Sequence, residues 1–196
     1  MKSIKTLALL LTLLVAGPLN AQEMNKKTKT VETSREVDLP AAALWKVLGQ
    51  DYGAIAFSHP TIIRSEYTPG TIKGSLGAER MCYFNDKETK MLREKIVKWD
   101  SENMTFTQRI VEARKFPIDK ENSLATYSVE DLGNGKSRLV AKLEYRTKPG
   151  FMSGMVKGSF KKLLDDYFIA IEHYARTNEK VTRENFKSIK KQYTKP

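Results

Sequence analysis

Six runs of six to nine residues, separated by short turns, fill the middle of the chain and constrain its fold most strongly. Several of them alternate apolar and polar residues, which is the pattern of strands with one buried face. The connections contain turn residues, such as Thr68-Pro69-Gly70 and Gly133-Asn134-Gly135. Runs of this length joined by short turns predict an antiparallel meander. The predicted strands are residues 62–67, 78–84, 91–99, 105–112, 124–131 and 138–146.

Further elements are predicted on both sides of the meander. Residues 31–39 alternate as a first strand, and residues 40–49 and 51–57 have the pattern of two short helices, the first opened by Pro40. Residues 151–178 form a long helix in which apolar residues recur every three or four positions along one stripe. The sequence therefore predicts an α+β domain whose curved antiparallel sheet wraps around the C-terminal helix.

Three stretches carry a family resemblance. Residues 44–60, L-W-K-V-L-G-Q-D-Y-G-A-I-A-F-S-H-P, are similar to the pattern W-x-x-L-x-D-[FY]-x-x-x-x-x-W-H-P, with Ser58 where tryptophan is common. Residues 74–80, G-S-L-G-A-E-R, are similar to G-x-x-G-x-x-R, and Glu94 precedes an apolar-x-x-x-D tail, here I-V-K-W-D. With this order of elements, residues 31–178 resemble the helix-grip superfamily of START lipid-transfer domains, birch-pollen-allergen-like proteins and polyketide cyclase/dehydrase-like proteins.

The resemblance implies a cavity between the sheet and the last helix. Members of the superfamily hold sterols, lipids, hormones or polyketides there, and some cyclise or dehydrate polyketides. By analogy with relatives whose loops close over a ligand, residues 68–77 and 113–122 are predicted to gate the cavity.

Strand alternation predicts which polar side chains face such a cavity. Arg80 and Glu94 fall on the inward faces of neighbouring strands. They should pair, because an isolated buried charge is very costly. Such a pair could orient a polar ligand head group or carry a proton transfer, or it could be a structural ion pair. The other polar candidates for ligand contact on inward faces are Gln108, Tyr127 and Tyr145.

Four residues outside this pattern carry alternative interpretations. His59 follows the second helix, where it could serve as an acid or base, bind a ligand or bond to the backbone. Met155 on the last helix could offer an adaptable apolar wall to a ligand, and core packing explains it as well. Cys82 is interpreted as a core thiol, because no base lies near it in the sequence. His173 lies one position off the apolar stripe and is predicted at the solvent side or boundary.

The net charge of +11 on 196 residues comes mainly from the ends of the chain. Residues 31–175 contribute only +2, the extension at residues 22–30 contributes +2, and residues 176–196 contribute +5. The basic tail, residues 179–196, is predicted to extend the last helix and then fray. It is either a solubilising end or a segment attracted to an anionic membrane surface. A nearly neutral core argues against a nucleic-acid partner.

Residues 1–21 have the pattern of a secretory signal, in which two lysines precede an apolar run at residues 7–16 and Ala21 supplies a small residue at the cleavage site. Ten apolar residues are too few to span about 30 Å of hydrocarbon at ~1.5 Å per residue. We therefore expect an exported protein, periplasmic or secreted, whose mature chain begins near Gln22.

The single cysteine excludes an intramolecular disulfide framework and a cysteine-cluster zinc site, and two histidines argue against a multi-histidine metal centre. No cofactor is expected. The predicted function is an exported binding or carrier protein for a hydrophobic small molecule or lipid. The alternatives are a polyketide cyclase/dehydratase-like enzyme with acid/base chemistry in the same cavity, and an accessory protein that binds a partner but no ligand. The small number of polar candidates favours binding.

Overall fold

A computed structural model describes residues 26–194, so the predicted signal sequence lies outside the described residues. Seven strands form one sheet in the order β1-β7-β6-β5-β4-β3-β2, and all neighbouring strands are antiparallel. This confirms the predicted meander, with the first strand added beside the last. The strands are β1 (Lys29–Val37), β2 (Arg64–Tyr67), β3 (Glu79–Tyr83), β4 (Met91–Asp100), β5 (Thr105–Arg114), β6 (Leu124–Gly133) and β7 (Lys136–Tyr145).

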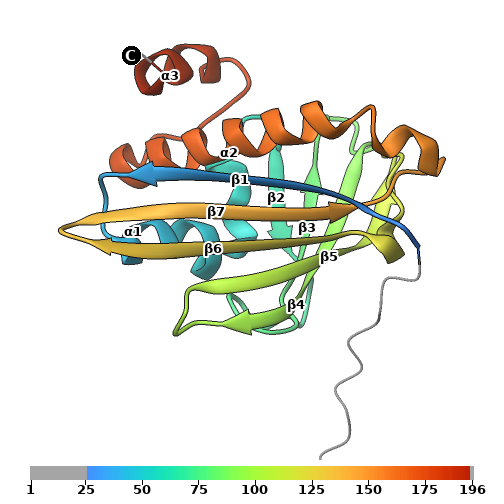
Figure 1. Cartoon of the computed structure of the whole chain (residues 1–196), viewed down its shortest axis with the longest axis horizontal. Coiled ribbons are helices and arrows are strands. Elements are labelled where there is room, and N and C mark those ends of the chain that lie inside the picture. The colour runs from blue at the N-terminus through green and yellow to red at the C-terminus, as the bar shows by residue number, and fades with distance from the viewer. Residues whose placement is uncertain (1–25, 195–196) are drawn as a thin grey trace, which may run out of the picture.

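Helical segments connect the strands at two points and form the C-terminal part of the chain. They are α1 (Ala41–Trp45), η1 (Lys46–Gln50), η2 (Tyr52–Phe57), η3 (Lys120–Asn122), η4 (Gly150–Ser153), α2 (Lys157–Thr177) and α3 (Phe186–Tyr193). The long helix α2 lies along the curved sheet beside β1, as Figure 1 shows. The α+β helix-grip arrangement predicted from the sequence is therefore the observed one.

The inner face of α2 closes the main core. Leu164, Tyr167, Phe168 and Ile171 belong to one buried cluster with residues of the sheet and of the helices after β1, and Phe168 and Ile171 are fully buried. Burying a leucine, isoleucine or phenylalanine side chain stabilises a fold by about 1.5–3 kcal/mol. The apolar stripe of α2 therefore holds the helix in the curve of the sheet.

The C-terminal segment departs from the sequence-based expectation. α2 ends at Thr177. The next residue, Asn178, adopts a left-handed φ of 57°, and the chain returns as α3 over the outer side of α2 (Figure 1). Val181 and Ile189 form a second buried cluster with Ile169 and Ala170 of α2. The prediction that the tail extends the last helix and frays was therefore wrong. α2 is apolar on two sides, and the second side is covered by α3.

Polar contacts between α2 and α3 bury groups that were expected near solvent. His173 is only 3% exposed, so its predicted place at the solvent side or boundary was wrong. Its Nδ1 lies 3.2 Å from the Tyr193 hydroxyl, and its Nε2 lies 3.2 Å from Glu179 Oε2. Lys190 of α3 pairs with Asp166 of α2 at 2.5 Å. These contacts lie beneath α3 and away from the inner face of α2.

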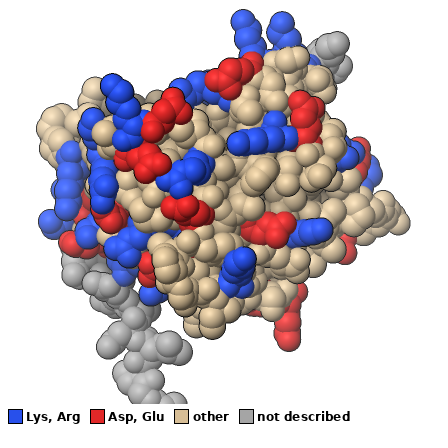
Figure 2. Space-filling model, turned by 180° about the vertical axis from the view of Figure 1, so that it is seen from behind, with Lys and Arg blue, Asp and Glu red and all other residues tan. Residues whose placement is uncertain are grey.

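Charges of both signs are interspersed over the outer surface. Figure 2 shows basic and acidic side chains side by side on one face of the molecule. Ion pairs account for part of this pattern, because Glu79 contacts both Arg93 and Lys95 at 3.1 Å. None of the helices within residues 26–194 combines the length and the apolar composition that crossing a bilayer requires.

Candidate functional site

A cavity of about 200 Å³ lies between the sheet and α2. Its volume falls below the roughly 300–1,000 Å³ of typical drug-sized ligand sites. One end opens beside Pro117 and Leu163, both solvent-exposed. The opposite end is closed by Arg80, Gln108 and other buried polar groups. The apolar wall between them includes Leu92, Ile110, Leu124, Leu143, Phe160 and Leu164.

The predicted Arg80–Glu94 pair forms at the closed end. The two residues are direct partners on β3 and β4 and are 3% and 9% exposed. Arg80 Nε donates to Glu94 Oε2 at 2.9 Å, Nη1 donates to the Tyr52 carbonyl at 2.8 Å, and Nη2 donates to Gln108 Oε1 at 3.2 Å. Gln108 Nε2 in turn donates to the other carboxylate oxygen of Glu94 at 2.9 Å. Both charges are thus surrounded by partners from the protein itself.

Local structure around this pair explains its geometry. The carbonyl that accepts from Arg80 belongs to Tyr52, at the start of η2. The centroid of the Tyr52 ring lies 3.9 Å from the guanidinium carbon of Arg80. The next residue is Gly53, where a Cβ atom would come within 2.3 Å of the Tyr67 ring. Cys82 Sγ donates to Glu94 Oε2 at 3.6 Å, and burial raises the pKa of its thiol. The thiol therefore stays protonated, as expected of a core cysteine.

His59 lines the cavity and also bonds to the backbone. Its Nδ1 accepts from the backbone N–H groups of Thr61 at 3.1 Å and Ile62 at 3.3 Å. An Nδ1 that accepts must be unprotonated, so the neutral ring carries its proton on Nε2. Burial, with a smaller contribution from nearby Arg80, lowers the pKa of His59 to about 3. His59 is therefore a neutral hydrogen-bond donor at ordinary pH and a very weak base.

Two tyrosines stand beside this histidine on the cavity wall. The Tyr167 ring of α2 lies 4.9 Å from the His59 ring, and the Tyr127 ring of β6 meets Tyr167 edge-on at 6.2 Å. Burial raises the pKa of both phenols, so they stay protonated. Neither hydroxyl has a hydrogen-bond partner among residues 26–194. Sequence reasoning included Tyr127 but missed Tyr167, which it counted as part of the apolar stripe.

Two predicted ligand contacts lie away from the cavity. Tyr145 is fully buried, but its hydroxyl donates to the Ser153 carbonyl at 2.6 Å because η4 covers this end of β7. Met155 is 77% exposed, because the predicted helix is interrupted after η4 and Met155 falls in the turn before α2. The structure therefore removes Tyr145 and Met155 from the candidate site and retains Arg80, Glu94, Gln108, His59 and Tyr127.

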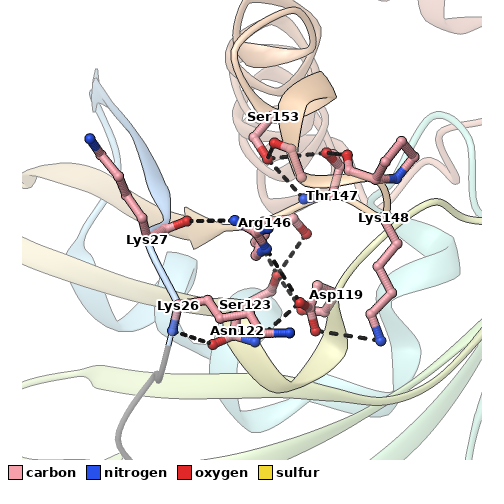
Figure 3. A network of polar contacts seen from close by, with 11 residues as sticks. Lys26, Lys27, Asp119, Asn122, Ser123, Arg146, Thr147, Lys148 and Ser153 are labelled. Atoms are coloured by element: carbon pink, nitrogen blue, oxygen red, sulfur yellow. Dashed lines mark hydrogen bonds and ion pairs between the residues drawn. The ribbon is translucent and has the colours of Figure 1, made fainter.

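The predicted gate at residues 113–122 borders the cavity mouth, whereas no residue of the other predicted gate, 68–77, lines the cavity. Figure 3 shows the polar network that holds this mouth loop. Asp119, 2% exposed, lies 3.6 Å from both Arg146 Nε and Lys148 Nζ and accepts from the Asn122 amide at 3.1 Å. Ser123 donates to the Asp119 carbonyl at 2.8 Å. The loop is thus fixed to the end of β7.

The candidate site offers neutral donors in an apolar space. Within the part of the chain that the structure describes, no group of three or more histidine, cysteine, aspartate or glutamate side chains is placed to hold a metal ion. What the site presents to a ligand is mainly an apolar wall with the neutral His59 and two protonated tyrosines, and Arg109, Ser123 and Thr147 also border the cavity. Such an arrangement can hold a mostly apolar molecule and orient one polar group on it.

Comparisons with known proteins agree with the fold. No curated protein matches the sequence. XoxI from Bacillus cereus superposes with a TM-score of 0.62 and 18% identity over 76% of this chain and 96% of its own. Ara h 8.0201 gives a TM-score of 0.61 with 21% identity, covering 77% of this chain and 99% of its own. Norcoclaurine synthase from Thalictrum flavum gives a TM-score of 0.59 with 18% identity, covering 88% of this chain and 99% of its own.

The sequence also matches a family profile. Residues 28–167 match the profile described as polyketide cyclase/dehydrase and lipid transport, and this span runs from β1 to the middle of α2. The match includes every strand of the sheet and every residue that lines the cavity. The chain therefore belongs to this polyketide cyclase/dehydrase and lipid transport family, within the helix-grip superfamily.

Proposed function

We propose that this chain is an exported binding or carrier protein that holds a hydrophobic small molecule or lipid between its sheet and α2. The observation that carries the proposal is the cavity of about 200 Å³, whose wall is mostly apolar and whose mouth opens between Pro117 and Leu163. Space of this size inside a close-packed interior is unusual, because protein cores leave few voids larger than a water molecule. An apolar cavity with a few polar groups is the usual form of a small-molecule site.

The arrangement of polar groups favours binding over acid/base catalysis. A cyclase or dehydratase of this fold would need a base that faces the cavity. Both carboxylate oxygens of Glu94 already accept hydrogen bonds, and Nδ1 of His59 is occupied by two backbone N–H groups. The open cavity also weighs against an accessory protein whose interior is filled.

Native mass spectrometry after mild extraction tests the binding proposal. We expect a non-covalent adduct of low mass that is lost when the cavity is filled by Leu143→Trp, since Leu143 lies on the cavity wall. Leu132→Trp is the matched control, because Leu132 is 39% exposed near the end of β6 and lies off the cavity. A wild-type chain that carries no adduct and binds no apolar probe would contradict the proposal.

Export rests on the apolar run at residues 7–16 and the small residue Ala21. Expression of the whole chain in a bacterial host, followed by fractionation and intact-mass measurement, tests it. We expect an extracytoplasmic product that has lost residues 1–21. A full-length product retained in the cytosol would refute export while leaving ligand binding untouched.

A further inference from the structure

The polar groups of the cavity constrain the chemistry of the ligand further. We infer that the ligand is uncharged and carries a carbonyl oxygen, which is recognised by the neutral donors of His59, Tyr127 and Tyr167 rather than by Arg80 and Glu94. This inference rests on the proposed binding function and specifies the polar end of the ligand. It assigns Tyr167, which lies within the apolar stripe of α2, a role in selecting the polar group of the ligand.

The Arg80–Glu94 pair has little capacity left for a ligand. Each of the three guanidinium nitrogens of Arg80 has a protein acceptor, and one face of the group lies over the Tyr52 ring. Glu94 accepts from Arg80, Cys82 and Gln108. A ligand carboxylate would have to displace Glu94 and leave one buried negative charge without its partner, which is very costly.

The unpartnered polar groups of His59, Tyr127 and Tyr167 on the cavity wall are donors. His59 Nε2–H has no partner among the described residues, because the hydrogen bonds of the ring all use Nδ1. The hydroxyls of Tyr127 and Tyr167 also have no hydrogen-bond partner within residues 26–194, and all three residues are more than nine-tenths buried. A ligand that displaces water from the cavity must supply an acceptor to these donors, because a buried donor without an acceptor costs free energy.

The positions of these donors favour a single recognition point. The rings of His59 and Tyr167 are 4.9 Å apart, and Tyr127 contacts Tyr167 from β6. The three side chains thus come from the segment after η2, from α2 and from β6, and their rings form one contiguous group on the cavity wall. The Nε2–H group can only donate, which fits a carbonyl better than an amine or another donor. The small cavity volume favours a compact ligand of one or two rings over a two-chain lipid.

Three naphthalene probes of similar shape test the inference. They are 2-acetylnaphthalene, which carries a neutral carbonyl, 2-isopropylnaphthalene, which carries no acceptor, and 2-naphthoate, which is a carboxylate at neutral pH. Dissociation constants are measured at pH 7 by calorimetry on the mature, delipidated chain. One or two added hydrogen bonds predict that the ketone binds about tenfold more tightly than the hydrocarbon. The carboxylate should bind more weakly than the ketone, because its charge is buried without a free partner.

Matched variants assign the preference to residues. Tyr127→Phe and Tyr167→Phe each remove one hydroxyl and should cut the ketone preference about threefold or more. His59→Asn keeps an acceptor near the Nδ1 position for the turn at Thr61 and removes the Nε2–H donor, so it should lower the preference as well. Tyr193→Phe is the control, because its hydroxyl contacts His173 under α3 and not the cavity.

The outcomes separate the inference from the proposed function. Equal affinity for ketone and hydrocarbon, or tightest binding of the carboxylate, would overturn the inference while ligand binding stands. A ketone preference that survives both phenylalanine variants and His59→Asn would also overturn it. Failure of all three probes to bind would overturn the proposed function together with the inference. If His59→Asn does not fold, the two tyrosine variants decide the question.

Discussion

Removing either charge of the Arg80–Glu94 pair should destabilise the fold, and removing both should cost less than the two single changes added together. Glu94→Gln leaves a guanidinium that is 3% exposed without its counter-ion, and Arg80→Met leaves a buried carboxylate. Breaking a buried pair by removing one partner costs about 3–5 kcal/mol. Glu94→Gln should fall near the lower limit, because its amide oxygen can still accept from Arg80. The double variant leaves no buried charge, so its cost should be less than the sum of the single costs by about 2–3 kcal/mol.

Urea denaturation monitored by circular dichroism gives the free energy of unfolding of all four chains. Glu130→Gln provides the matched control, since the Glu130–Arg138 pair lies on the same sheet with both side chains at least 36% exposed. We expect no measurable change for this control, because exposed pairs are screened by solvent. If Glu94→Gln also leaves the free energy of unfolding unchanged, or if the cost of the double variant equals the sum of the single costs, the pair does not stabilise the fold. Its charges would then be available to a ligand.

Two further predictions concern the histidine and the C-terminal helix. The pKa of His59, about 3 in the fold against about 6.5 unfolded, means that only the unfolded chain binds this proton between those values. The free energy of unfolding should therefore decrease as the pH is lowered from 6.5, by up to ~1.4 kcal/mol per pH unit. This decrease should be larger in the wild type than in His59→Asn. A difference in stability between the two chains that does not change with pH would refute this prediction. Ile189→Ala should release α3 from α2, at a cost of about 2 kcal/mol in the free energy of unfolding. Hydrogen exchange should then show that backbone amides lose protection in α3 but not in β5–β7. Unchanged protection in α3 would count against its docking on α2.

The sequence predicted the sheet and the ion pair because both follow from local rules. Alternation with a period of two assigns each strand residue to a face, and short turns make consecutive strands antiparallel neighbours. These two rules bring Arg80 to Glu94, and the observed register places them directly opposite each other. They also place Gln108 on the inward face of β5. The polar cluster at the closed end of the cavity was therefore predictable from the spacing of its members.

Residues whose environment depends on long-range packing could not be predicted in this way. Tyr145 does face inward, but η4 folds over it and takes its hydroxyl, and nothing in β7 itself predicts that cover. The second apolar side of α2 was missed because its partners, Val181 and Ile189, are isolated apolar residues in a basic segment. Tyr167 was hidden for the opposite reason, since a tyrosine within an apolar stripe has the same spacing whether its hydroxyl is buried or faces a cavity.

The distribution of charge in the interior bears on how a ligand could enter and leave. Charged groups are paired within the protein at both ends of the cavity. Arg80 pairs with Glu94 at the closed end, and Asp119 lies 3.6 Å from both Arg146 and Lys148 behind the mouth loop. A neutral ligand can therefore exchange without separating an ion pair, so its release does not meet the cost of exposing an unpaired buried charge. An enzyme that builds up negative charge on its substrate benefits instead from a cation held ready for it. Because Arg80 is already engaged on every nitrogen, the interior suits reversible binding of an uncharged molecule better than stabilisation of a developing anion.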